Sequence, residues 1–264
     1  MNVVVRNTCN RPRHLATRHT VRRALLLVIA SALVLVASAC AGARPTEEQD
    51  ADRENRRGAA VAATGTDAEI RKVSRRQWGL MVDAGMVRPE CPIQRPAALR
   101  VVEVNHFDFT GEVKRGRLVV NVDVAESVAR IFSELYDQRF PIRRMQPVEA
   151  FGGDTNLSLA ADNTSAFNCR RADQINAPFA ASPHANGRAV DINPRENPWR
   201  DLRCKCWFPG PDNRLRTAGP GKVTKGGSAW RAFRAEGWIW QDIDVPDYMH
   251  FDTGYPSRPF NAGQ

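Results

Sequence analysis

Histidines and long hydrophobic runs are scarce in this chain of 264 residues. Only five histidines are present, and two of them, His14 and His19, lie near the N-terminus. The apolar stretch Ala24–Val36 is too short for a comfortable membrane-spanning helix, which needs roughly 20 residues. Residues 1–40 also contain no aspartate or glutamate. These scarcities argue against a transmembrane helix in this region and restrict any imidazole-based site to a few positions.

The positive charge of the chain is unevenly distributed. The formal net charge is +9, and six arginines in residues 1–40 account for six of these charges, which leaves +3 for residues 41–264. Charge confined to one terminus is weak ground for nucleic-acid binding, so we expect no nucleic-acid partner. The hydrophobic content of 42% and the charged content of 25% are those of an ordinary globular domain.

The first 40 residues have the order of a secretory signal peptide. A basic segment ending at Arg23 precedes the apolar stretch Ala24–Val36, and residues 37–39 are the small residues Ala-Ser-Ala. Cys40 follows directly, so residues 37–40 resemble a bacterial lipobox, in which the cysteine is lipidated and becomes the new N-terminus. We therefore expect export to the outer face of the cytoplasmic membrane and cell wall, with a lipid anchor on Cys40. The alternative is an ordinary signal peptide in which Cys40 is incidental.

Residues 41–68 differ in composition from the rest of the chain. They are rich in Ala, Gly, Arg, Glu, Asp and Thr and contain almost no large apolar residue. Such a segment buries too little surface to offset the entropy of ordering, so we interpret it as a disordered tether. Residues 69–264 then form the folded domain, which we expect to be monomeric.

Hydrophobic periodicity predicts an α+β fold for residues 69–264. The clearest helix is Asp123–Arg139, where Asp123 and Glu126 resemble a capping box. A helix over residues 69–84 is expected to end at Gly85. The other expected elements are a helix over residues 226–236 and strands over residues 98–109, 117–122, 142–151, 165–170, 188–193, 238–240 and 248–252. Because strands and helices do not alternate regularly, this order favours a small antiparallel sheet with flanking helices.

Four cysteines follow Cys40: Cys91, Cys169, Cys204 and Cys206. In an exported chain an even number of cysteines favours disulfide bonds, and the spacings are not the C-x-x-C of zinc sites. Three pairings are open to four cysteines. Because Cys204 and Cys206 are only two positions apart, we expect each of them to pair elsewhere.

The histidines beyond the N-terminal region are His106, His184 and His250. Residues 182–191 read Ser-Pro-His-Ala-Asn-Gly-Arg-Ala-Val-Asp, and residues 247–252 read Asp-Tyr-Met-His-Phe-Asp. Two imidazoles and a carboxylate suit a catalytic zinc, which takes three protein ligands and leaves a fourth position for water. Zinc lowers the pKa of that water to about 7, and a nearby carboxylate must then accept its proton. Either histidine taken singly is explained as well by a hydrogen-bonded structural role.

The combined pattern Ser-x-His-x-x-Gly-x-Ala-x-Asp and, far downstream, Asp-x-x-His-Phe resembles the zinc D-alanyl-D-alanine carboxypeptidase and L-alanyl-D-glutamate endopeptidase family. That family shares its fold with the hedgehog signalling domain. The similarity includes residues 140–142, 163–170, 191–194 and 197–199, which resemble one exported branch, and it covers roughly residues 98–256. It implies a hedgehog/DD-peptidase-like fold, with zinc held by His184, Asp191 and His250.

The resemblance also implies that Asp247 is the general base. Many relatives have glutamate at this position, so Asp247 is a variant of the family pattern. The rival carboxylate is Asp252, which lies two residues beyond His250 and therefore on the same face of a presumed strand. Asp247 precedes that strand after a proline, where a position at the mouth of the site is easier to reach.

Two further positions are candidates for contact with substrate. Arg170 is expected to stabilise developing negative charge or to bind a substrate carboxylate, with Arg143 and Arg144 as rivals. Ser182 either binds substrate or orients the loop that carries His184.

The resemblance implies hydrolysis of an amide bond in peptidoglycan stem peptides, by a D-alanyl-D-alanine carboxypeptidase or a peptidoglycan endopeptidase. A lipid anchor and a tether would hold the domain near this substrate. Loops 152–165 and 194–225 are expected to decide whether the cleft accepts a terminal D-alanine or an internal bond. The alternative is a non-catalytic, zinc-containing lipoprotein of the same fold that binds the cell wall.

Overall fold

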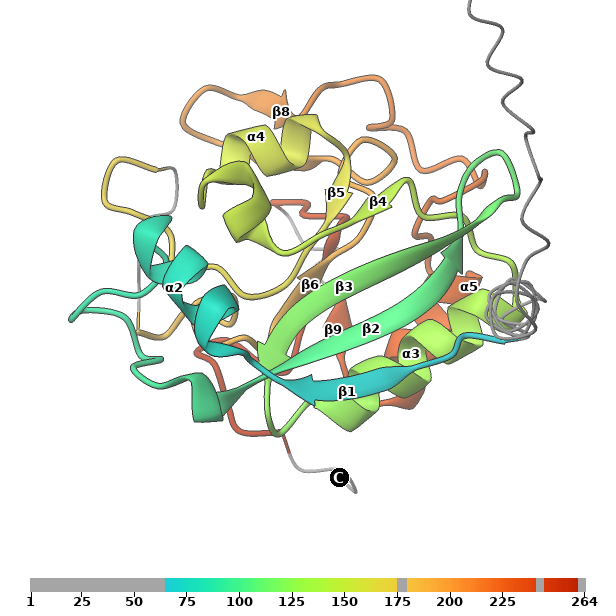
Figure 1. Ribbon diagram of the computed structural model, residues 1–264. Helices are drawn as coiled ribbons and strands as arrows, with labels where there is room; N and C mark the ends of the chain where they lie inside the picture. Colours follow the sequence, from blue (N-terminus) through green and yellow to red (C-terminus); the bar gives the residue numbers. More distant parts are fainter. Residues whose placement is uncertain (1–64, 175–179, 241–244, 261–264) are drawn as a thin grey trace, which may run out of the picture. The chain divides into compact units, whose positions relative to one another are not determined.

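The computed structural model describes residues 65–174, 180–240 and 245–260 (Figure 1). The predicted signal peptide, Cys40 and residues 41–64 of the predicted tether lie outside these ranges. The described strands are β1 Glu69–Lys72, β2 Leu99–Phe107, β3 Val113–Asn121, β4 Arg144–Met145, β5 Asn163–Thr164, β6 Ala189–Asp191, β7 Trp199–Asp201, β8 Cys206–Phe208, β9 Ile239–Trp240 and β10 His250–Asp252. The described α-helices are α2 Arg75–Asp83, α3 Ala125–Asp137, α4 Thr155–Ala160 and α5 Ser228–Ala235. None of them is long and apolar enough to cross a membrane.

The largest sheet is antiparallel and has the order β1-β2-β3. Its two long strands place neighbouring residues on opposite faces, as the period of a β-strand requires. The pair Val102 and Leu118 contributes to one hydrophobic core, whereas the adjacent pair Val101 and Val119 contributes to another. Both faces of this sheet are therefore partly covered, which explains why adjacent residues in the middle of each long strand are apolar and buried.

The main core lies between this sheet and helices α3 and α5. Helix α3 presents Val128, Ile131, Phe132 and Leu135 to it, at the spacing of one helical face. Helix α5 adds Phe233, whose ring stacks on Phe251 of β10 with centroids 3.9 Å apart. Figure 1 shows α3 and α5 side by side next to the large sheet. This core connects the large sheet to the strand that carries His250.

A second antiparallel sheet has the order β6-β10-β9. Two smaller strand pairs complete the fold, β4-β5 in parallel and β7-β8 antiparallel. Mixed helices and small, mostly antiparallel sheets make this an α+β fold, as the sequence predicts.

Several predicted elements differ from the observed ones. The predicted helix over residues 69–84 is strand β1 followed by α2, because the Ser74 hydroxyl accepts from the Gln77 backbone nitrogen at 3.1 Å and starts the helix there. The expected stop at Gly85 is confirmed by its left-handed φ of 67° directly after the helix cap. Of the predicted strand 142–151 only β4 remains, because Pro147 has no backbone N–H and instead precedes a 3₁₀ helix.

Two other predictions are wrong because contacts with residues distant in the sequence override the local pattern. The expected strand 165–170 does not form, and this segment makes isolated backbone contacts, including the Ser165 bridge to Asp191. The expected capping box at α3 does not form, because the Asp123 carboxylate accepts from Arg188 at 2.8 and 2.9 Å and the helix starts without a side-chain cap.

The four downstream cysteines form two disulfide bonds, Cys91–Cys169 and Cys204–Cys206. The expectation that Cys204 and Cys206 pair elsewhere is therefore wrong. Lys205 between them has a left-handed φ of 56°, which brings their Cα atoms to 5.1 Å, within the range of a disulfide. The reversal at Lys205 belongs to the short connection between β7 and β8.

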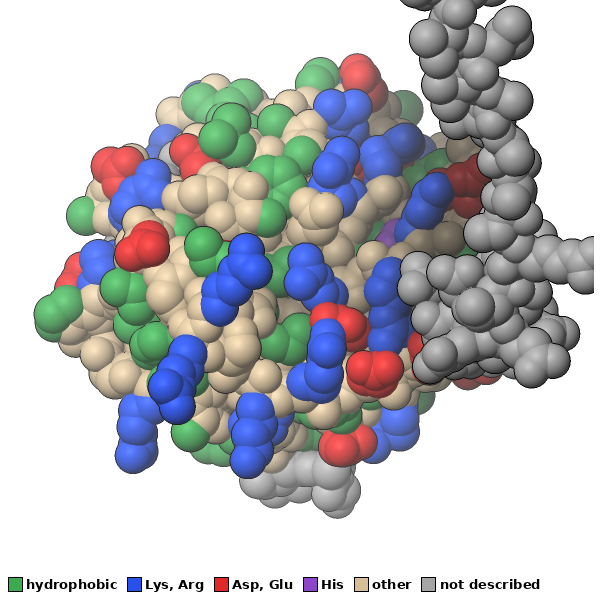
Figure 2. Space-filling model, viewed as in Figure 1, with side chains coloured by type: hydrophobic (Ala, Val, Ile, Leu, Met, Phe, Trp, Pro, Cys, Tyr) green, Lys and Arg blue, Asp and Glu red, His purple; other side chains and the backbone are tan. Residues whose placement is uncertain are grey.

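Charged side chains of both signs are interspersed on the face of the domain seen in Figure 2. Among the ion pairs of the domain, Arg71 pairs with Glu103, and Arg115 pairs with Asp67 at 3.2 Å. Neighbouring carboxylates therefore neutralise part of the positive charge of the domain.

Candidate metal centre

Strands β6 and β10 bring Asp191 and His250 together, although 59 positions separate them in the sequence. The two residues are direct partners in the antiparallel register, so their side chains lie next to each other. Apolar neighbours on the strands, Val190 and Phe251, are fully buried in the main core and hold this register. The pairing of β6 with β10 therefore places two donor groups next to each other on one small sheet.

His184 approaches from the loop that precedes β6. Gly187 has a left-handed φ of 68°, and its carbonyl accepts from the Asn121 backbone nitrogen at the end of β3 at 2.7 Å. A Cβ atom on Gly187 would lie 2.7 Å from that same nitrogen, so only glycine fits. The His184 carbonyl in turn accepts from the Asn168 backbone nitrogen at 3.1 Å. These contacts fix the loop against the large sheet and place the His184 ring beside β10.

Three potential ligand atoms converge at this point. His184 Nε2 lies 3.0 Å from His250 Nδ1 and 3.2 Å from Asp191 Oδ1, and His250 Nδ1 lies 3.0 Å from the same carboxylate oxygen. Atoms bound about 2.0–2.1 Å from a tetrahedral zinc lie about 3.3 Å from one another, so this triangle is close to the required size. The donor set of two imidazoles and one carboxylate also fits zinc.

The outward-facing nitrogens of both imidazoles are already engaged. His184 Nδ1 donates to the Ala166 carbonyl at 2.7 Å, and His250 Nε2 donates to Asp252 Oδ2 at 2.9 Å. Each contact fixes the tautomer, since a nitrogen that donates to a carbonyl or carboxylate must bear the hydrogen. The nitrogens facing Asp191 are then left with lone pairs to offer a metal ion, as in histidine ligands supported by second partners.

Buried charge around this triangle favours a cation. Burial lowers the pKa of His250, but hydrogen bonds to Asp191 and Asp252 outweigh burial and raise the pKa to about 10. Burial raises the pKa of Asp191, but the adjacent histidines hold it well below its usual range. Both pKa shifts have the same origin, because the anionic carboxylates and the protonated imidazole stabilise each other's charge. A divalent cation supplies that positive charge and replaces the proton on His250.

Asp247 lies three residues before His250 and presents a carboxylate without a hydrogen-bond partner at Oδ1 among the described residues. Burial, together with the negative charge of Asp191, raises its pKa to about 7 against the opposing effect of His250 and Arg170. A carboxyl group with this pKa exchanges protons readily at neutral pH, which suits a general base.

Aromatic packing holds the segment that carries Asp247. The backbone of this residue bridges to Trp199 of β7, and the following Tyr248 ring stacks on Trp207 of β8 with centroids 5.8 Å apart. The Arg216 guanidinium covers the Tyr248 ring at 4.3 Å. The β7-β8 hairpin, which contains the Cys204–Cys206 bond, therefore positions Asp247.

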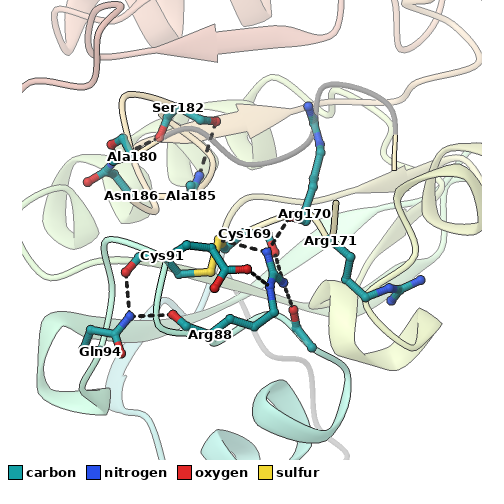
Figure 3. The surroundings of a disulfide bond; sticks show 12 residues. Arg88, Cys91, Gln94, Cys169, Arg170, Arg171, Ala180, Ser182, Ala185 and Asn186 are labelled. Atoms are coloured by element: carbon teal, nitrogen blue, oxygen red, sulfur yellow. Dashed lines mark hydrogen bonds and ion pairs between the residues drawn. A yellow bond between two sulfur atoms is a disulfide. The ribbon is translucent and has the colours of Figure 1, made fainter. Parts of the chain in front are cut away.

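A small pocket beside His184 and Asp191 is also lined by Asn168 and Arg170. Arg170 Nε and Asn168 Oδ1 are shielded from solvent and have no hydrogen-bond partner among the described residues. Figure 3 shows the Arg170 side chain directed away from the Cys91–Cys169 disulfide, while Arg88 donates to the Arg170 carbonyl at 2.7 Å. A donor and an acceptor thus remain available beside the candidate ligands.

The other predicted site residues are placed elsewhere. The Ser182 hydroxyl accepts from the Ala185 backbone nitrogen at 3.5 Å, a contact within the loop that carries His184 (Figure 3). Arg143 is paired with Asp162 at 2.7 Å, and Arg144 is exposed on β4. His106 is buried in β2, with Nδ1 3.3 Å from the Phe107 carbonyl. Of the three arginine candidates, only Arg170 lines the pocket beside His184.

Residues 176–253 match the model of a protein family described as D-alanyl-D-alanine carboxypeptidase. This segment is similar to that family. It contains His184, Asp191, Asp247 and His250, although it is less than half of the chain. No curated protein and no solved structure matches the chain. The similarity supports a hydrolase of the metallopeptidase class, and the His-Asp-His triangle forms a candidate metal site within the matched segment.

Sequence reasoning gave no role to several groups around the site. The Ala166 carbonyl and the Asn168 side chain lie in a segment whose similarity to the family was noted without a function. Thr155 and Ser158 of α4 also line the pocket, but they lie within residues 152–165, for which the sequence predicts a loop. The Asp154 side chain, which accepts from the Leu157 nitrogen at 3.0 Å, is the one local signal that marks this helix.

Proposed function

We propose that this protein is a zinc-dependent peptidase that hydrolyses an amide bond in peptidoglycan stem peptides, in the manner of a D-alanyl-D-alanine carboxypeptidase. One observation carries the proposal. Three donor atoms from His184, Asp191 and His250 lie 3.0–3.2 Å apart, and each imidazole has its second nitrogen bound to an acceptor. A bound metal ion would explain why two imidazole nitrogens converge on one carboxylate oxygen while their second nitrogens are held by acceptors.

The three ligand residues would hold the ion beside the pocket that His184 and Asp191 line. Zinc bound there would polarise the scissile carbonyl and lower the pKa of a water molecule to about 7. Asp247 would accept the proton of the attacking water and return it to the leaving amine, which its pKa of about 7 permits in both directions.

Arg170 and Asn168 would position the substrate. The unpartnered Arg170 Nε is a donor for a peptide carboxylate or for negative charge that develops on the carbonyl oxygen. The unpartnered Asn168 Oδ1 is an acceptor for a peptide N–H. The pocket beside His184 would therefore offer one donor and one acceptor to the end of a peptide.

The finer features of this proposal follow from the resemblance. They are the hedgehog/DD-peptidase fold, the exported lipoprotein branch, and attachment to the outer face of the cytoplasmic membrane through Cys40. A lipid anchor and a tether would keep the domain at the cell wall, where stem peptides are found.

The deciding experiment uses the purified full-length chain, with its zinc content measured, incubated with defined muropeptides and followed by mass spectrometry. We expect release of D-alanine or of an internal fragment that stops on chelation and resumes with added zinc. His184→Ala should lose both metal and activity, whereas Asp247→Asn should keep the metal and lose activity. The exposed Asp137, at the end of α3, provides the matched control Asp137→Asn.

Two outcomes would contradict the proposal. Stoichiometric zinc without cleavage of any muropeptide would favour a non-catalytic cell-wall-binding lipoprotein. Absence of metal from a folded, zinc-supplemented protein would show that the three residues are not ligands.

A further inference from the structure

A second cavity lies away from the candidate metal centre. Its volume is about 430 Å³, within the range of small-molecule sites, and it shares no lining residue with the pocket beside His184. Charged and amide side chains line it: Arg143, Arg195, Glu196, Asp212 and Asn213. Two guanidinium groups and two carboxylates therefore face one space.

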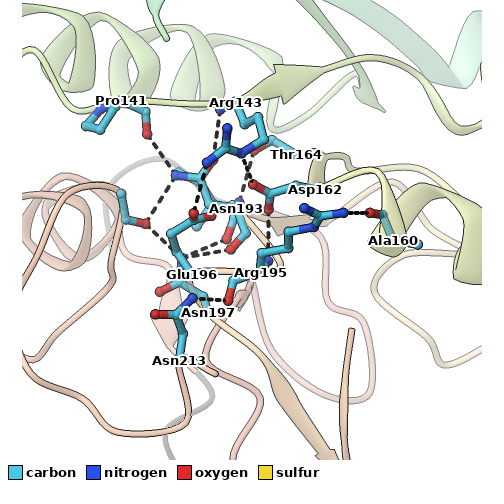
Figure 4. Close-up of polar contacts among 12 residues, drawn as sticks. Pro141, Arg143, Ala160, Asp162, Thr164, Asn193, Arg195, Glu196, Asn197 and Asn213 are labelled. Atoms are coloured by element: carbon cyan, nitrogen blue, oxygen red, sulfur yellow. Dashed lines mark hydrogen bonds and ion pairs between the residues drawn. The ribbon is translucent and has the colours of Figure 1, made fainter. Parts of the chain in front are cut away.

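The walls of this cavity are tied together by buried contacts, which Figure 4 shows around Asp162. The carboxylate of this fully buried aspartate accepts from Arg143 Nε at 2.7 Å and from the Arg195 backbone nitrogen at 2.8 Å. On the other side, Asn213 donates to the Arg195 carbonyl at 2.8 Å. The fold thus fixes the wall of the cavity, because Asp162 binds both Arg143 and the Arg195 backbone, and Asn213 holds the Arg195 carbonyl.

Glu196 is the least satisfied group in the cavity wall. The residue is only 9% exposed, and its Oε2 atom is shielded from solvent without a hydrogen-bond partner among the described residues. Its other oxygen is 3.4 Å from Arg143, a distant contact with a cation that Asp162 already binds more closely. The Glu196 side chain also lies within hydrogen-bonding reach of Asp162, so two carboxyl groups share this part of the wall with only Arg143 beside them. This concentration of acidic groups favours a cationic ligand group next to Glu196.

Arg195, in the same cavity wall, favours a ligand group of negative charge. Its Nη2 donates to the Ala160 carbonyl at 2.7 Å, and among the described residues the side chain forms no ion pair. The side chain is exposed on the cavity wall, so its remaining N–H groups are accessible to a ligand. A guanidinium in this state favours a carboxylate.

We propose that this cavity binds a zwitterionic amino acid or a short peptide with free termini, with the ammonium group at Glu196 and the carboxylate at Arg195. The presence of both charge signs in one cavity disfavours a polyanion, which Glu196 and Asp212 would repel. Burial and the neighbouring Asp162 also raise the pKa of Glu196 to about 7, so an adjacent ammonium group would stabilise its charged form.

The test is calorimetric titration of the full-length chain with glycylglycine, with N-acetylglycylglycine and with glycylglycine amide. We expect the zwitterion to bind in the millimolar range or tighter, and either blocked form to bind at least about tenfold more weakly, since each lacks one charge-assisted contact. The titration is repeated after metal removal with EDTA, and the affinity should not change. Binding that requires metal would place the dipeptide at the candidate metal centre and overturn this proposal without affecting the proposed peptidase.

Two substitutions test whether the dipeptide binds in this cavity. Glu196→Gln and Arg195→Met should each weaken glycylglycine binding at least about tenfold. Glu112→Gln and Arg214→Met are matched controls, because both residues are exposed and neither lines the cavity. Thermal denaturation establishes that the variants are folded, and the comparison of free with blocked peptides needs no variant. No binding of glycylglycine to the wild-type chain, or unchanged binding in Glu196→Gln, would overturn the proposal.

Discussion

Replacement of Asp252 by asparagine separates the two carboxylates that compete for the role of general base. Asp252 is 1% exposed, and its two oxygens accept from different donors, Oδ2 from His250 Nε2 at 2.9 Å and Oδ1 from the Gly254 backbone nitrogen at 2.7 Å. Asparagine has one carbonyl oxygen and one NH₂ group. Whichever way its amide is oriented, one N–H faces another N–H, so the variant cannot satisfy both contacts.

The expected consequence is weaker metal binding. If the amide nitrogen faces His250, this imidazole is driven toward the tautomer with hydrogen on Nδ1, which removes the lone pair that faces Asp191. Loss of a hydrogen bond to a charged group costs about 1.5–3 kcal/mol, and outer partners of metal ligands affect affinity by about 10–100-fold. We therefore expect Asp252→Asn to raise the zinc dissociation constant about 10–100-fold, measured by competition with a chromophoric chelator.

The control for this experiment is Asp247→Asn. Because Asp247 Oδ1 has no hydrogen-bond partner among the described residues, its replacement should leave the zinc dissociation constant within about threefold while abolishing muropeptide hydrolysis. Unchanged zinc affinity in Asp252→Asn, together with loss of hydrolysis in the zinc-saturated variant, would refute the reasoning and identify Asp252 as the base.

Four further outcomes follow from the same geometry. Since Asp247 acts as a base only when deprotonated, kcat/KM should fall about tenfold per pH unit below its pKa of about 7; a flat profile from pH 5 to 8 would exclude it. Zinc binding at pH 7 should release about one proton from His250, whose pKa is about 10 before binding, and calorimetry in buffers of different ionisation enthalpy would detect none if this histidine is not a ligand. Gly187→Ala should lower the free energy of unfolding by about 1–3 kcal/mol in denaturant titrations, because its Cβ would lie 2.7 Å from a backbone nitrogen of β3 at a φ of 68°; equal stability would show that the loop shifts freely. Loss of the Cys91–Cys169 bond, which joins positions 78 residues apart, should lower stability by about 4 kcal/mol in a double serine variant, and a change below about 1 kcal/mol would contradict a constraining role.

Some features of the fold were predictable because their signals are local. The apolar face of α3 arises from the helical period, and α3 and β2 form close to the ranges that the sequence predicts, whereas β3 begins at Val113, before the predicted start at residue 117. Other features were decided by distant partners. Asp123 satisfies Arg188, which lies 65 positions away, instead of capping α3, and residues 69–72 pair with the edge of β2 instead of extending α2. No local pattern contains information about such partners.

In the candidate site, too, some features are determined by the sequence and others only by the tertiary structure. Residue types and spacing within each motif, including Gly187 after His184 and Asp252 two positions after His250, are properties of the sequence and already indicated a metal-binding chemistry. Only tertiary structure places His184 against His250, 66 positions away. It also shows that the Asp252 carboxylate supports an imidazole, whereas Asp247 Oδ1 is buried without a hydrogen-bond partner among the described residues. It also places Glu196 in a second cavity with an unsatisfied oxygen. The physical reason is that a side chain's chemistry is set by its covalent structure, whereas its protonation, its partners and its exposure are set by whatever the folded chain packs around it.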